Sequence, residues 1–489
     1  MTQENRYDAP TLPGTYWERD AEHVVVRAHL AAGRMSVSQW HTLRQILDDY
    51  PDLDLRITTR QNARIYGADK ALAEKLLLRL TEAGFQPVGK KGDIVINWDS
   101  GLRSDEVFDI YPYALAISDW QSSGLGRAAQ VPGKLKTSMT SSPDALETVS
   151  YADLGFIAKC NDKGEPGFAV VGGGSLGAMP RLAAQLLDFI PAGDILRAME
   201  AYAQVFIDLF AESKVGKKRM RFAIRKMGEE AFVAAFHKAY DDVKAKNLTG
   251  LPQNALRKRD WGEGIDASHP NLRATRFEGI YSLYLPISAG IVPNEFVAAL
   301  DDFVNYLEYR PELALAADQA VVVRDLAGDD ALALLDALAP LMEKFGIGAA
   351  QSHIACVGAD LCRFGLAHNS ALSAVLRRFN AEDLPEIGIS GCMNSCSGHQ
   401  VKPLGFWGKK SDHNDFANDV YEVVIGGSAC RDAAGAIIGE NIGSLSVKDV
   451  EAFLTDLIAQ QKDSGEPWEQ FVVNHADALK ALVRLAKSE

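Results

Sequence analysis

Strand-like and helix-like patterns of hydrophobic residues alternate along the first hundred residues, and they predict strands and helices in turn. The short segments HVVVRAHL and LDLRITTRQNARIY predict strands over His23–Leu30 and Leu53–Tyr66. Apolar residues at every third or fourth position predict helices over Ser36–Asp49 and Leu72–Ala83, with Ser36 as a favourable N-cap. The expected order is strand, helix, strand, helix.

The same order of elements returns about 257 residues later in the chain. The pattern predicts strands over Tyr281–Ser288 and Leu313–Val323, and helices over Asn294–Leu307 and Ala331–Phe345. A period of this length indicates that the chain consists of two related halves.

A shared spacing supports the repeat. An Ala-Gly pair ends the first strand of each copy, and a glutamine follows it at nearly the same distance. Gln61 lies 28 residues after Gly33, and Gln319 lies 29 residues after Gly290. Because both order and spacing recur, we interpret the halves as products of a duplication.

Charge narrows the range of binding partners. The chain has 65 acidic and 51 basic residues, and its net charge is −14. Nucleic-acid binding needs a basic surface, so we expect no nucleic-acid partner, and a small anionic substrate would need a local basic pocket. The sequence shows no secretory signal and no run of eighteen apolar residues, so we expect a cytoplasmic protein that does not bind membranes.

Four of the six cysteines form two close pairs. Cys356 and Cys362 have five residues between them, and Cys392 and Cys396 have three. Four thiolates are the usual ligands of a [4Fe–4S] cluster. Two alternatives remain open on spacing alone: a zinc site, whose pairs usually have shorter gaps, and buried core thiols.

The surroundings of the pairs favour the cluster. Gly391 and Gly398 flank the second pair, and glycine lets a backbone approach a bulky inorganic group closely. Cys160 and Cys430 fit no ligand position, and we expect both to be structural.

The segments IACVGADLC and ISGCMNSCSG closely resemble the cluster-binding signature of the nitrite and sulfite reductase family. The resemblance extends over roughly residues 20–455. It implies that Cys356, Cys362, Cys392 and Cys396 bind a [4Fe–4S] cluster. It also implies that Cys396 bridges the cluster to the iron of sirohaem.

The resemblance further implies an α+β fold, duplicated about a pseudo-twofold axis. Two ferredoxin-like half-repeats would accompany two larger α/β domains that bind sirohaem and the cluster. We expect the half-repeats at residues 1–85 and 270–346, and the larger domains at residues 86–250 and 347–489.

The segment LRITTRQNARIYG resembles a family motif that holds the sirohaem carboxylates, which implies that Arg56, Thr58, Arg60 and Arg64 are sirohaem contacts. A guanidinium binds a carboxylate through two parallel hydrogen bonds. In one continuous strand, these four side chains would share a face. From the residues alone, a solvated cationic strand face is the favoured interpretation.

The densest basic run, KKRMRFAIRK, lies where a family helix contacts sirohaem, which implies that Lys217, Lys218, Arg219 and Arg221 are further contacts. On a continuous helix, Lys217, Arg221 and Arg225 would share a face at four-residue intervals. A solvated helix face is the alternative from charge alone.

The segments HVVVRAHLAAG and VPGKLKTS resemble family segments that face the substrate side of the haem. The resemblance implies that Arg27, Lys134 and Lys136 are catalytic, because converging cations can hold an oxyanion and deliver protons to it. Lysines at both positions of the second motif look more like sulfite reductases than nitrite reductases.

Two other segments need comment. Val88–Asp99 lacks the arginine with which the family contacts its substrate, and Lys90 and Lys91 are the nearby cations. Gly172–Gly177 satisfies GxGxxG, but Pro180 interrupts the following segment and no ribose-binding acid follows. We therefore expect backbone amides that bind a carboxylate here, rather than a dinucleotide site.

Together these features predict an oxidoreductase with sirohaem and a [4Fe–4S] cluster. The expected reaction is six-electron reduction of sulfite to sulfide. The sequence shows no flavin or nicotinamide domain, so we expect a separate donor, either ferredoxin or a flavoprotein reductase. Alternatives are reduction of nitrite to ammonia, a repurposed non-catalytic haem protein, and a cobalamin-pathway oxygenase of the same fold.

Overall fold

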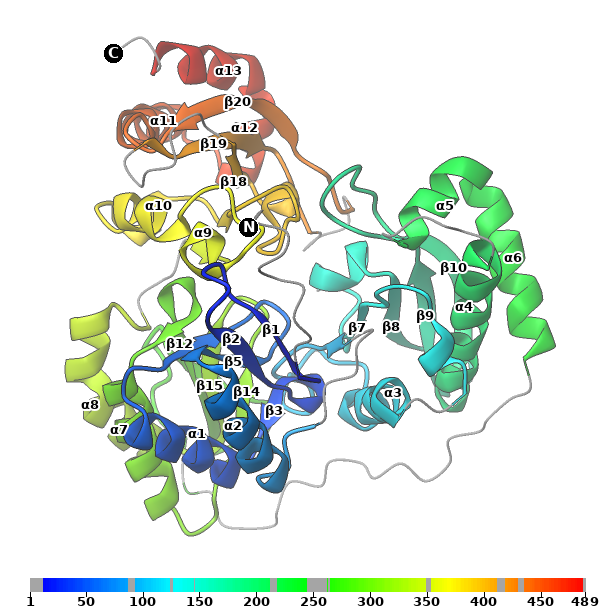
Figure 1. The fold of residues 1–489 in the computed structure, drawn as a ribbon, viewed down its shortest axis with the longest axis horizontal. Coiled ribbons are helices and arrows are strands. Elements are labelled where there is room, and N and C mark those ends of the chain that lie inside the picture. The colour runs from blue at the N-terminus through cyan, green and yellow to red at the C-terminus, as the bar shows by residue number, and fades with distance from the viewer. Residues whose placement is uncertain are drawn as a thin grey trace.

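The computed structural model describes residues 12–86, 93–123, 126–144, 146–211, 218–243, 262, 264–348, 353–410, 418–429 and 435–486. These residues form four five-stranded sheets with helices packed against them. Figure 1 shows the two sheets of the half-repeats side by side, with one larger domain beside them and the other above them. Among the described residues, no helix has the length and apolar character needed to cross a membrane.

The first half-repeat follows the predicted order. Helix α1 begins where the sequence predicts, because the Ser36 hydroxyl accepts a hydrogen bond from the Gln39 amide and the Gln39 side chain accepts one from the Ser36 amide. The strands are β1 (Thr15–Trp17), β2 (Val24–Ala28), β3 (Arg34–Met35), β4 (Asp54–Ile57) and β5 (Ala63–Ala68), and the helices are α1 (Val37–Asp49) and α2 (Lys70–Glu82).

The second half-repeat has the same elements. Its strands are β11 (Leu272–Ala274), β12 (Ile280–Pro286), β13 (Ile291–Val292), β14 (Leu313–Leu315) and β15 (Ala320–Ala327), and its helices are α7 (Asn294–Tyr306) and α8 (Gly328–Phe345). The two sheets exchange one edge strand each. Strand β13 pairs with β4 in the order β1-β2-β5-β4-β13, and β3 pairs with β14 in the order β11-β12-β15-β14-β3. One hydrophobic core extends through both half-repeats.

The structure corrects the prediction of single strands over Leu53–Tyr66 and Leu313–Val323. Each segment is a hairpin, β4–β5 or β14–β15. The chain reverses where Gln61 and Gln319 adopt positive φ angles of 55° and 70°. The argument from alternation along one strand is therefore wrong, and Arg56 and Arg64 are instead direct cross-strand partners.

The repeated glycine explains these turns. A Cβ added to Gly33 would lie 2.6 Å from the Cβ of Gln61, and one added to Gly290 would lie 2.5 Å from the Gln319 Nε2 atom. Each glutamine therefore packs directly against a residue that must lack a side chain. The spacing found in the sequence reflects this contact.

Each glutamine also ties its hairpin to the start of a larger domain. The Gln61 amide exchanges two hydrogen bonds with the backbone of Ile96, at 3.0 and 2.8 Å. The Gln319 amide accepts from the Ala355 N–H at 3.0 Å and donates to the Ile57 carbonyl at 3.0 Å. Because Ala355 precedes Cys356, the second hairpin is anchored beside a predicted cluster ligand.

The two larger sheets share one topology. In each, three strands run parallel in sequence order and two antiparallel strands follow. The first sheet contains β6 (Ile94–Val95), β7 (Thr137–Thr140), β8 (Leu154–Cys160), β9 (Pro166–Gly172) and β10 (Ala184–Pro191). The second contains β16 (His353–Ala355), β17 (Ile387–Ser390), β18 (Leu404–Lys409), β19 (Val420–Ile425) and β20 (Glu440–Ser446). The predicted α+β duplication is confirmed at this level too.

Helices cover these sheets. The first larger domain has α3 (Tyr111–Ser123), α4 (Ile195–Phe210), α5 (Met220–Met227) and α6 (Glu229–Asp242). The second has α9 (Gly358–Leu361), α10 (Asn369–Leu376), α11 (Val450–Ser464), α12 (Trp468–Asn474) and α13 (Ala476–Leu485). Each larger domain has its own apolar core, so the site described below lies between units that are internally well packed.

Candidate functional site

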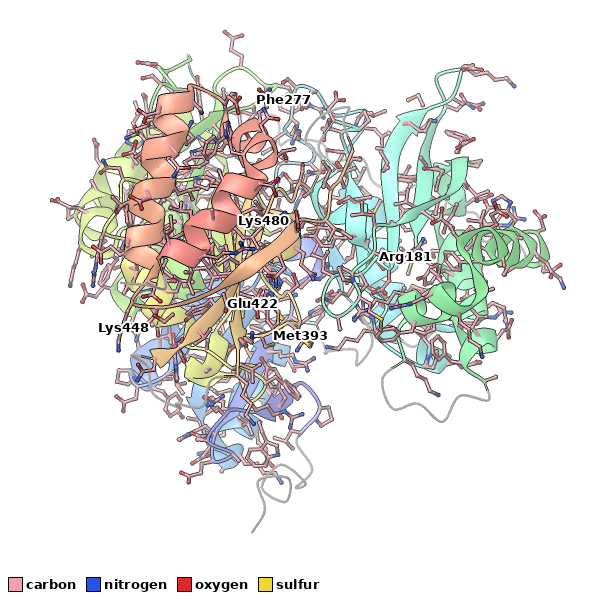
Figure 2. All side chains as sticks on the ribbon, turned by 90° about the horizontal axis from the view of Figure 1, so that it is seen from above. Arg181, Phe277, Met393, Glu422, Lys448 and Lys480 are labelled. Carbon is pink, nitrogen blue, oxygen red and sulfur yellow. The ribbon has the colours of Figure 1, made fainter. Side chains whose placement is uncertain are left out.

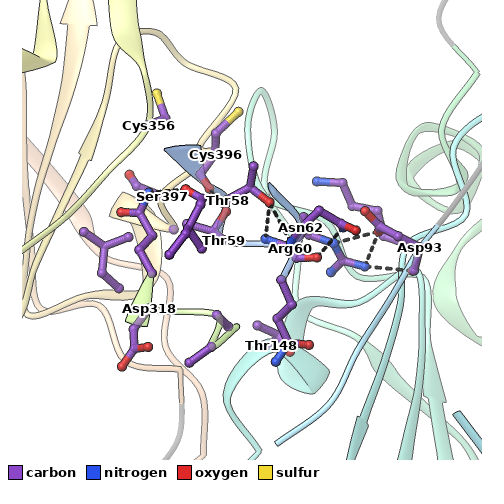
Figure 3. A pocket seen from close by; sticks show the side chains of 18 of the residues that line it. Thr58, Thr59, Arg60, Asn62, Asp93, Thr148, Asp318, Cys356, Cys396 and Ser397 are labelled. Carbon is purple, nitrogen blue, oxygen red and sulfur yellow. Dashed lines mark hydrogen bonds and ion pairs between the residues drawn. The ribbon is translucent and has the colours of Figure 1, made fainter. Parts of the chain in front are cut away.

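A cavity of about 450 Å³ lies where both hairpins meet the two larger domains (Figure 3). Its lining combines cationic side chains of the first half with cysteines of the second. The predicted site residues that line it are Arg27, Arg56, Thr58, Arg60, Arg64, Lys134, Lys136, Arg219, Cys356, Cys362 and Cys396. Segments that are hundreds of residues apart in sequence thus contribute to one space.

Three arginines form a row across the first sheet. Strand pairing places Arg64 of β5 between Arg27 of β2 and Arg56 of β4. The Tyr16 ring lies 5.2 Å from the guanidinium of Arg27 and 5.6 Å from that of Arg64. Cross-strand neighbours share a face, so the row presents adjacent positive charges to the cavity.

Some of this charge is already compensated. Arg56 pairs with Asp54 at 2.6 Å. Arg60 donates through Nε to Asp93 at 2.7 Å and through Nη2 to the Thr137 carbonyl at 3.0 Å, as Figure 3 shows for Asp93. Burial opposes ionisation of Asp93, but the ion pair with Arg60 prevails and lowers its pKa.

The second half-repeat has no corresponding row of arginines. The positions that correspond to Arg27, Arg64 and Arg56 in the strand register are occupied by Tyr284, Val322 and Ala314. Only the first half-repeat can therefore bind anions in this way.

Lys134 and Lys136 precede β7. The backbone N–H of Lys136 donates to Asp153 at 3.0 Å, which fixes the segment. Burial and the positive charge of Arg60 lower the pKa of Lys136 to about 8. Its ammonium can therefore release a proton near neutral pH.

The basic run contributes through a buried network. Arg219 donates to both oxygens of Asp153 at 3.1 Å and to the Ser175 hydroxyl at 2.6 Å. Arg221 donates to the same hydroxyl and to the Leu176 carbonyl, the latter at 2.6 Å. Of these two arginines, Arg219 lines the cavity and Arg221 is buried behind Ser175.

The predicted helical face of this run is corrected. Helix α5 begins only at Met220, and Arg221 is buried whereas Arg225 is exposed. Lys217 lies outside the described residues. Lys218 does not line the cavity, and its backbone carbonyl packs against Gly133.

The glycine run Gly172–Gly177 is a loop, not the start of a helix. The Gly177 N–H donates to the Gln400 side chain at 2.7 Å, and the Gln400 Nε2 donates back to the Gly177 carbonyl at 3.1 Å. A dinucleotide motif would instead place a helix N-terminus there. The loop joins the two larger domains near Met393. Figure 2 labels Met393 at the edge of the second larger domain that faces Arg181 of the first.

The four cysteines lie in two neighbouring loops. Cys356 follows β16, Cys362 ends α9, and Cys392 and Cys396 follow β17. Strands β16 and β17 are adjacent and parallel, so both loops leave the same edge of the sheet. Cys160 is exposed at the end of β8, and Cys430 lies outside the described residues.

The cysteine loops donate hydrogen bonds to one thiol and favour ionisation of another, whereas burial raises the pKa of Cys392. The Cys356 sulfur accepts hydrogen bonds from the Gly391 N–H and the Asn369 side chain, both at 3.3 Å. Contact with Cys356 and the charges of Lys136 and Arg64 lower the pKa of Cys396 to about 6, which favours the thiolate that binds metal. Among the described residues, no three His, Cys, Asp or Glu side chains stand close enough to hold one metal ion. In a [4Fe–4S] cluster each thiolate binds a different iron, so its ligands stand further apart.

Sequence reasoning missed several residues of the site. Thr59 donates from its hydroxyl to the Cys396 carbonyl at 2.7 Å and so ties the first hairpin to the cysteine loop. Arg103 lines the cavity and is held by Asp105 at 2.6 Å, whereas Lys90 and Lys91 lie outside the described residues. No sequence pattern marks the interaction partners of Thr59 and Arg103. Of the two residues, only Thr59 could have been suggested by the sequence, because it lies inside the recognised motif.

Four cations of the cavity remain uncompensated. Within the part of the chain that the structure describes, Arg27, Arg64, Lys134 and Lys136 have no carboxylate at ion-pair distance, although all four line the cavity. The buried Nε of Arg27 also has no hydrogen-bond partner. Burial and the adjacent Arg64 lower the pKa of Arg27. Such a space fits a ligand with several carboxylates, together with a small anion.

Comparisons with known proteins agree with this geometry. Residues 17–83 match the family model "Nitrite/Sulfite reductase ferredoxin-like half domain", and residues 90–244 match "Nitrite and sulphite reductase 4Fe-4S domain". The chain is 23% identical over 482 residues to a sulfite reductase [ferredoxin] of Mycobacterium tuberculosis, covering 93% of this chain and 82% of the relative. It is 26% identical over 442 residues to a ferredoxin–nitrite reductase of Synechococcus elongatus, covering 87% and 82%.

A solved structure shares the fold. The Mycobacterium tuberculosis NirA protein superposes with a TM-score of 0.76 at 21% identity, over 94% of this chain and 88% of that one.

Proposed function

Since the chain belongs to the nitrite and sulfite reductase family, we propose that it reduces sulfite to sulfide with six electrons from a separate donor protein. The protein is an oxidoreductase, and its cofactors are sirohaem and a [4Fe–4S] cluster. When bound, these groups supply the electron-transfer chemistry, and the protein supplies binding, orientation and protons.

The observation that carries the proposal is the set of uncompensated cations beside the cysteine loops. Arg27, Lys134 and Lys136 would hold the oxygens of the anion, because no carboxylate among the described residues lies at ion-pair distance from them. Lys136 would also donate protons, since its pKa of about 8 allows it to lose and regain a proton near neutral pH.

The remaining predicted residues would hold the cofactors. Cys356, Cys362, Cys392 and Cys396 would bind the cluster, with Cys396 as the bridge to sirohaem. The sirohaem carboxylates would bind the cavity-lining side chains of Arg56, Thr58, Arg60, Arg64 and Arg219. Arg221 would act through Ser175, and Lys217 and Lys218 would add positive charge nearby.

Sulfite is the proposed substrate for an electrostatic reason. Near neutral pH, sulfite has three oxygens and exists partly as a dianion, whereas nitrite has two oxygens and a single charge. A cavity with several uncompensated cations attracts the dianion more strongly. The lysines at both positions 134 and 136 favour the same choice.

Ferredoxin is the proposed donor. Both relatives compared above are named for ferredoxin. A flavoprotein reductase remains the second candidate, and turnover with each purified donor would distinguish the two.

The substrate assignment can be tested with purified protein and reduced viologen, which removes dependence on the natural donor. Sulfite and nitrite are compared at equal enzyme concentration, and we expect the higher kcat/KM for sulfite. A higher value for nitrite would reverse the assignment. Lack of turnover with both anions, despite full loading with sirohaem and cluster, would indicate a non-catalytic relative.

A further inference from the structure

Asn369 is the first residue of α10, and its side chain is directed at a predicted cluster ligand. The residue is 1% exposed. Its Nδ2 atom donates to the Cys356 carbonyl at 2.7 Å, to the Ile389 carbonyl at 3.2 Å and to the Cys356 sulfur at 3.3 Å. One amide group therefore faces three acceptors.

The surroundings determine the orientation of this amide. If the side chain were flipped, its oxygen would face two carbonyl oxygens and repel both. In the observed orientation the buried Oδ1 of Asn369 accepts no hydrogen bond from any residue that the structure describes. The fold thus leaves an acceptor unsatisfied and keeps the donor on Cys356, although an unsatisfied buried group costs free energy.

The backbone is shaped to admit this contact. A Cβ added to Gly358, where φ is +56°, would lie 2.9 Å from the Asn369 Cγ atom. The Gly391 N–H donates to the same sulfur from another side at 3.3 Å. Two N–H groups from separate segments therefore converge on one thiolate.

Hydrogen bonds to ligand sulfurs are one of the main determinants of cluster potential. Reduction adds negative charge, part of which falls on the thiolates, so an N–H donor stabilises the reduced form more than the oxidised form. We propose that Asn369 is a positioning residue that acts through Cys356 to raise the reduction potential of the [4Fe–4S] cluster. This inference rests on the cluster assignment made above.

The test replaces Asn369 with leucine, which has a similar size but no donor. The midpoint potential is measured by a redox titration followed by electron paramagnetic resonance, and exchangeable protons near the reduced cluster are measured by proton ENDOR in H2O and D2O. We expect Asn369→Leu to lower the midpoint potential and to lose one exchangeable-proton coupling. Unchanged values for both would overturn the proposal.

A matched control comes from the next residue. The Ser370 hydroxyl donates to Asp360 at 2.5 Å, and among the described residues it makes no hydrogen bond to a cysteine. Ser370→Ala should therefore leave both the potential and the proton coupling at the wild-type values. An equal shift in this variant would show that any disturbance at the start of α10 has the same effect, and would also overturn the proposal.

Iron and sulfide analysis separates this inference from the assignment on which it rests. Wild-type protein reconstituted with iron and sulfide that holds no cluster would refute the cofactor assignment itself. A second variant, Asn369→Ala, avoids the bulk of leucine and should also have a lower potential. Loss of the cluster in both Asn369 variants but not in Ser370→Ala would indicate a role in assembly instead of tuning.

Discussion

Lys136 combines partial burial, a lowered pKa and the absence of a carboxylate at ion-pair distance among the described residues. Its charge is unfavourable for folding, since burial and Arg60 both oppose it. A residue kept in this state is better explained by function than by stability.

We therefore predict that Lys136→Ala lowers kcat for sulfite by roughly 10²–10³-fold, the usual contribution of a proton donor. The free energy of unfolding should not fall, because the substitution removes an unfavourable buried charge. Viologen-linked kinetics and urea unfolding measure the two effects. Lys136→Arg keeps the charge but cannot donate a proton near neutral pH, so it should retain sulfite binding with low kcat. Normal turnover in either variant would contradict the role.

Two buried histidines lead to a second prediction at this scale. Burial lowers the pKa of His353 to about 4 and that of His399 to about 3. An unfolded histidine binds a proton near pH 6.5, so below that pH the unfolded chain holds more protons than the folded one. Stability should be complete above pH 6.5 and should fall as the pH drops towards 4.

The expected loss is about 2 kcal/mol per histidine between pH 7 and pH 5. Urea unfolding of the apoprotein at pH 7 and pH 5 checks it. In His399→Phe, which keeps a ring next to Trp407, the loss should be smaller than in the wild type. Equal stability at the two pH values in the wild-type protein would refute this account.

At the scale of elements, the hairpins depend on a glycine that no local pattern explains. Gly290 has a φ of +68°, and an added Cβ would lie 2.3 Å from the Ile57 carbonyl oxygen. Gly84 has a similar φ of +81°, but nothing lies within 4 Å of its added Cβ. The two positions differ in packing and not in backbone conformation.

Gly290→Ala should therefore destabilise the protein by about 2–4 kcal/mol, from backbone strain and overpacking together. Gly84→Ala should cost only the strain, about 1–2 kcal/mol. Urea unfolding of both variants provides the comparison. A loss in Gly84→Ala as large as that in Gly290→Ala would show that the contact with Ile57 and Gln319 is unimportant.

The hairpins also show what sequence patterns cannot reveal. Helices α1, α2, α7 and α8 follow from apolar periodicity, and Ser36 gives the start of α1 correctly. The turns at Gln61 and Gln319 contain no Gly or Pro, and their only usual turn residues are Asn62 and Asp318, which alone are weak signals. A tertiary contact with a distant glycine stabilises each turn, and a local pattern does not record such a contact.

The same contrast between local patterns and long-range contacts applies to the site. Spacing singled out the four cysteines, and a family resemblance singled out Arg27, Lys134 and Lys136; their roles stay predictions. Asp93, Thr59 and Asn369 were missed because their roles depend on partners elsewhere in the chain, such as Arg60 or Cys396. Long-range polar contacts are the part of the site that required the structure.

At the scale of the whole molecule, the exchange of β3 and β13 makes the two half-repeats depend on each other. Each sheet lacks an edge strand without the other half, and both share one apolar core. A separated half would expose part of that core to water.

We predict that fragments 12–243 and 264–486 do not unfold cooperatively when produced alone, and that co-expression yields a folded complex. Urea unfolding of each fragment and size-exclusion chromatography of the pair measure this. The full chain carrying a protease site at position 255 is the control, since cleavage after folding should leave the complex intact. Cooperative unfolding of either isolated fragment would contradict the prediction.

The exchanged strands also bear on how the two copies diverged. Each copy contributes an edge strand to the sheet of the other, so deletion or replacement of either copy would disrupt both sheets. Mutations would be tolerated only at positions that this shared framework does not require. One hairpin retains the arginine row, whereas the other has Tyr284, Val322 and Ala314 and serves to anchor the strand before Cys356. We infer that mutual dependence in the framework kept both copies while their sites diverged, with the proposed anion contacts in the first half and the proposed cluster ligands in the second.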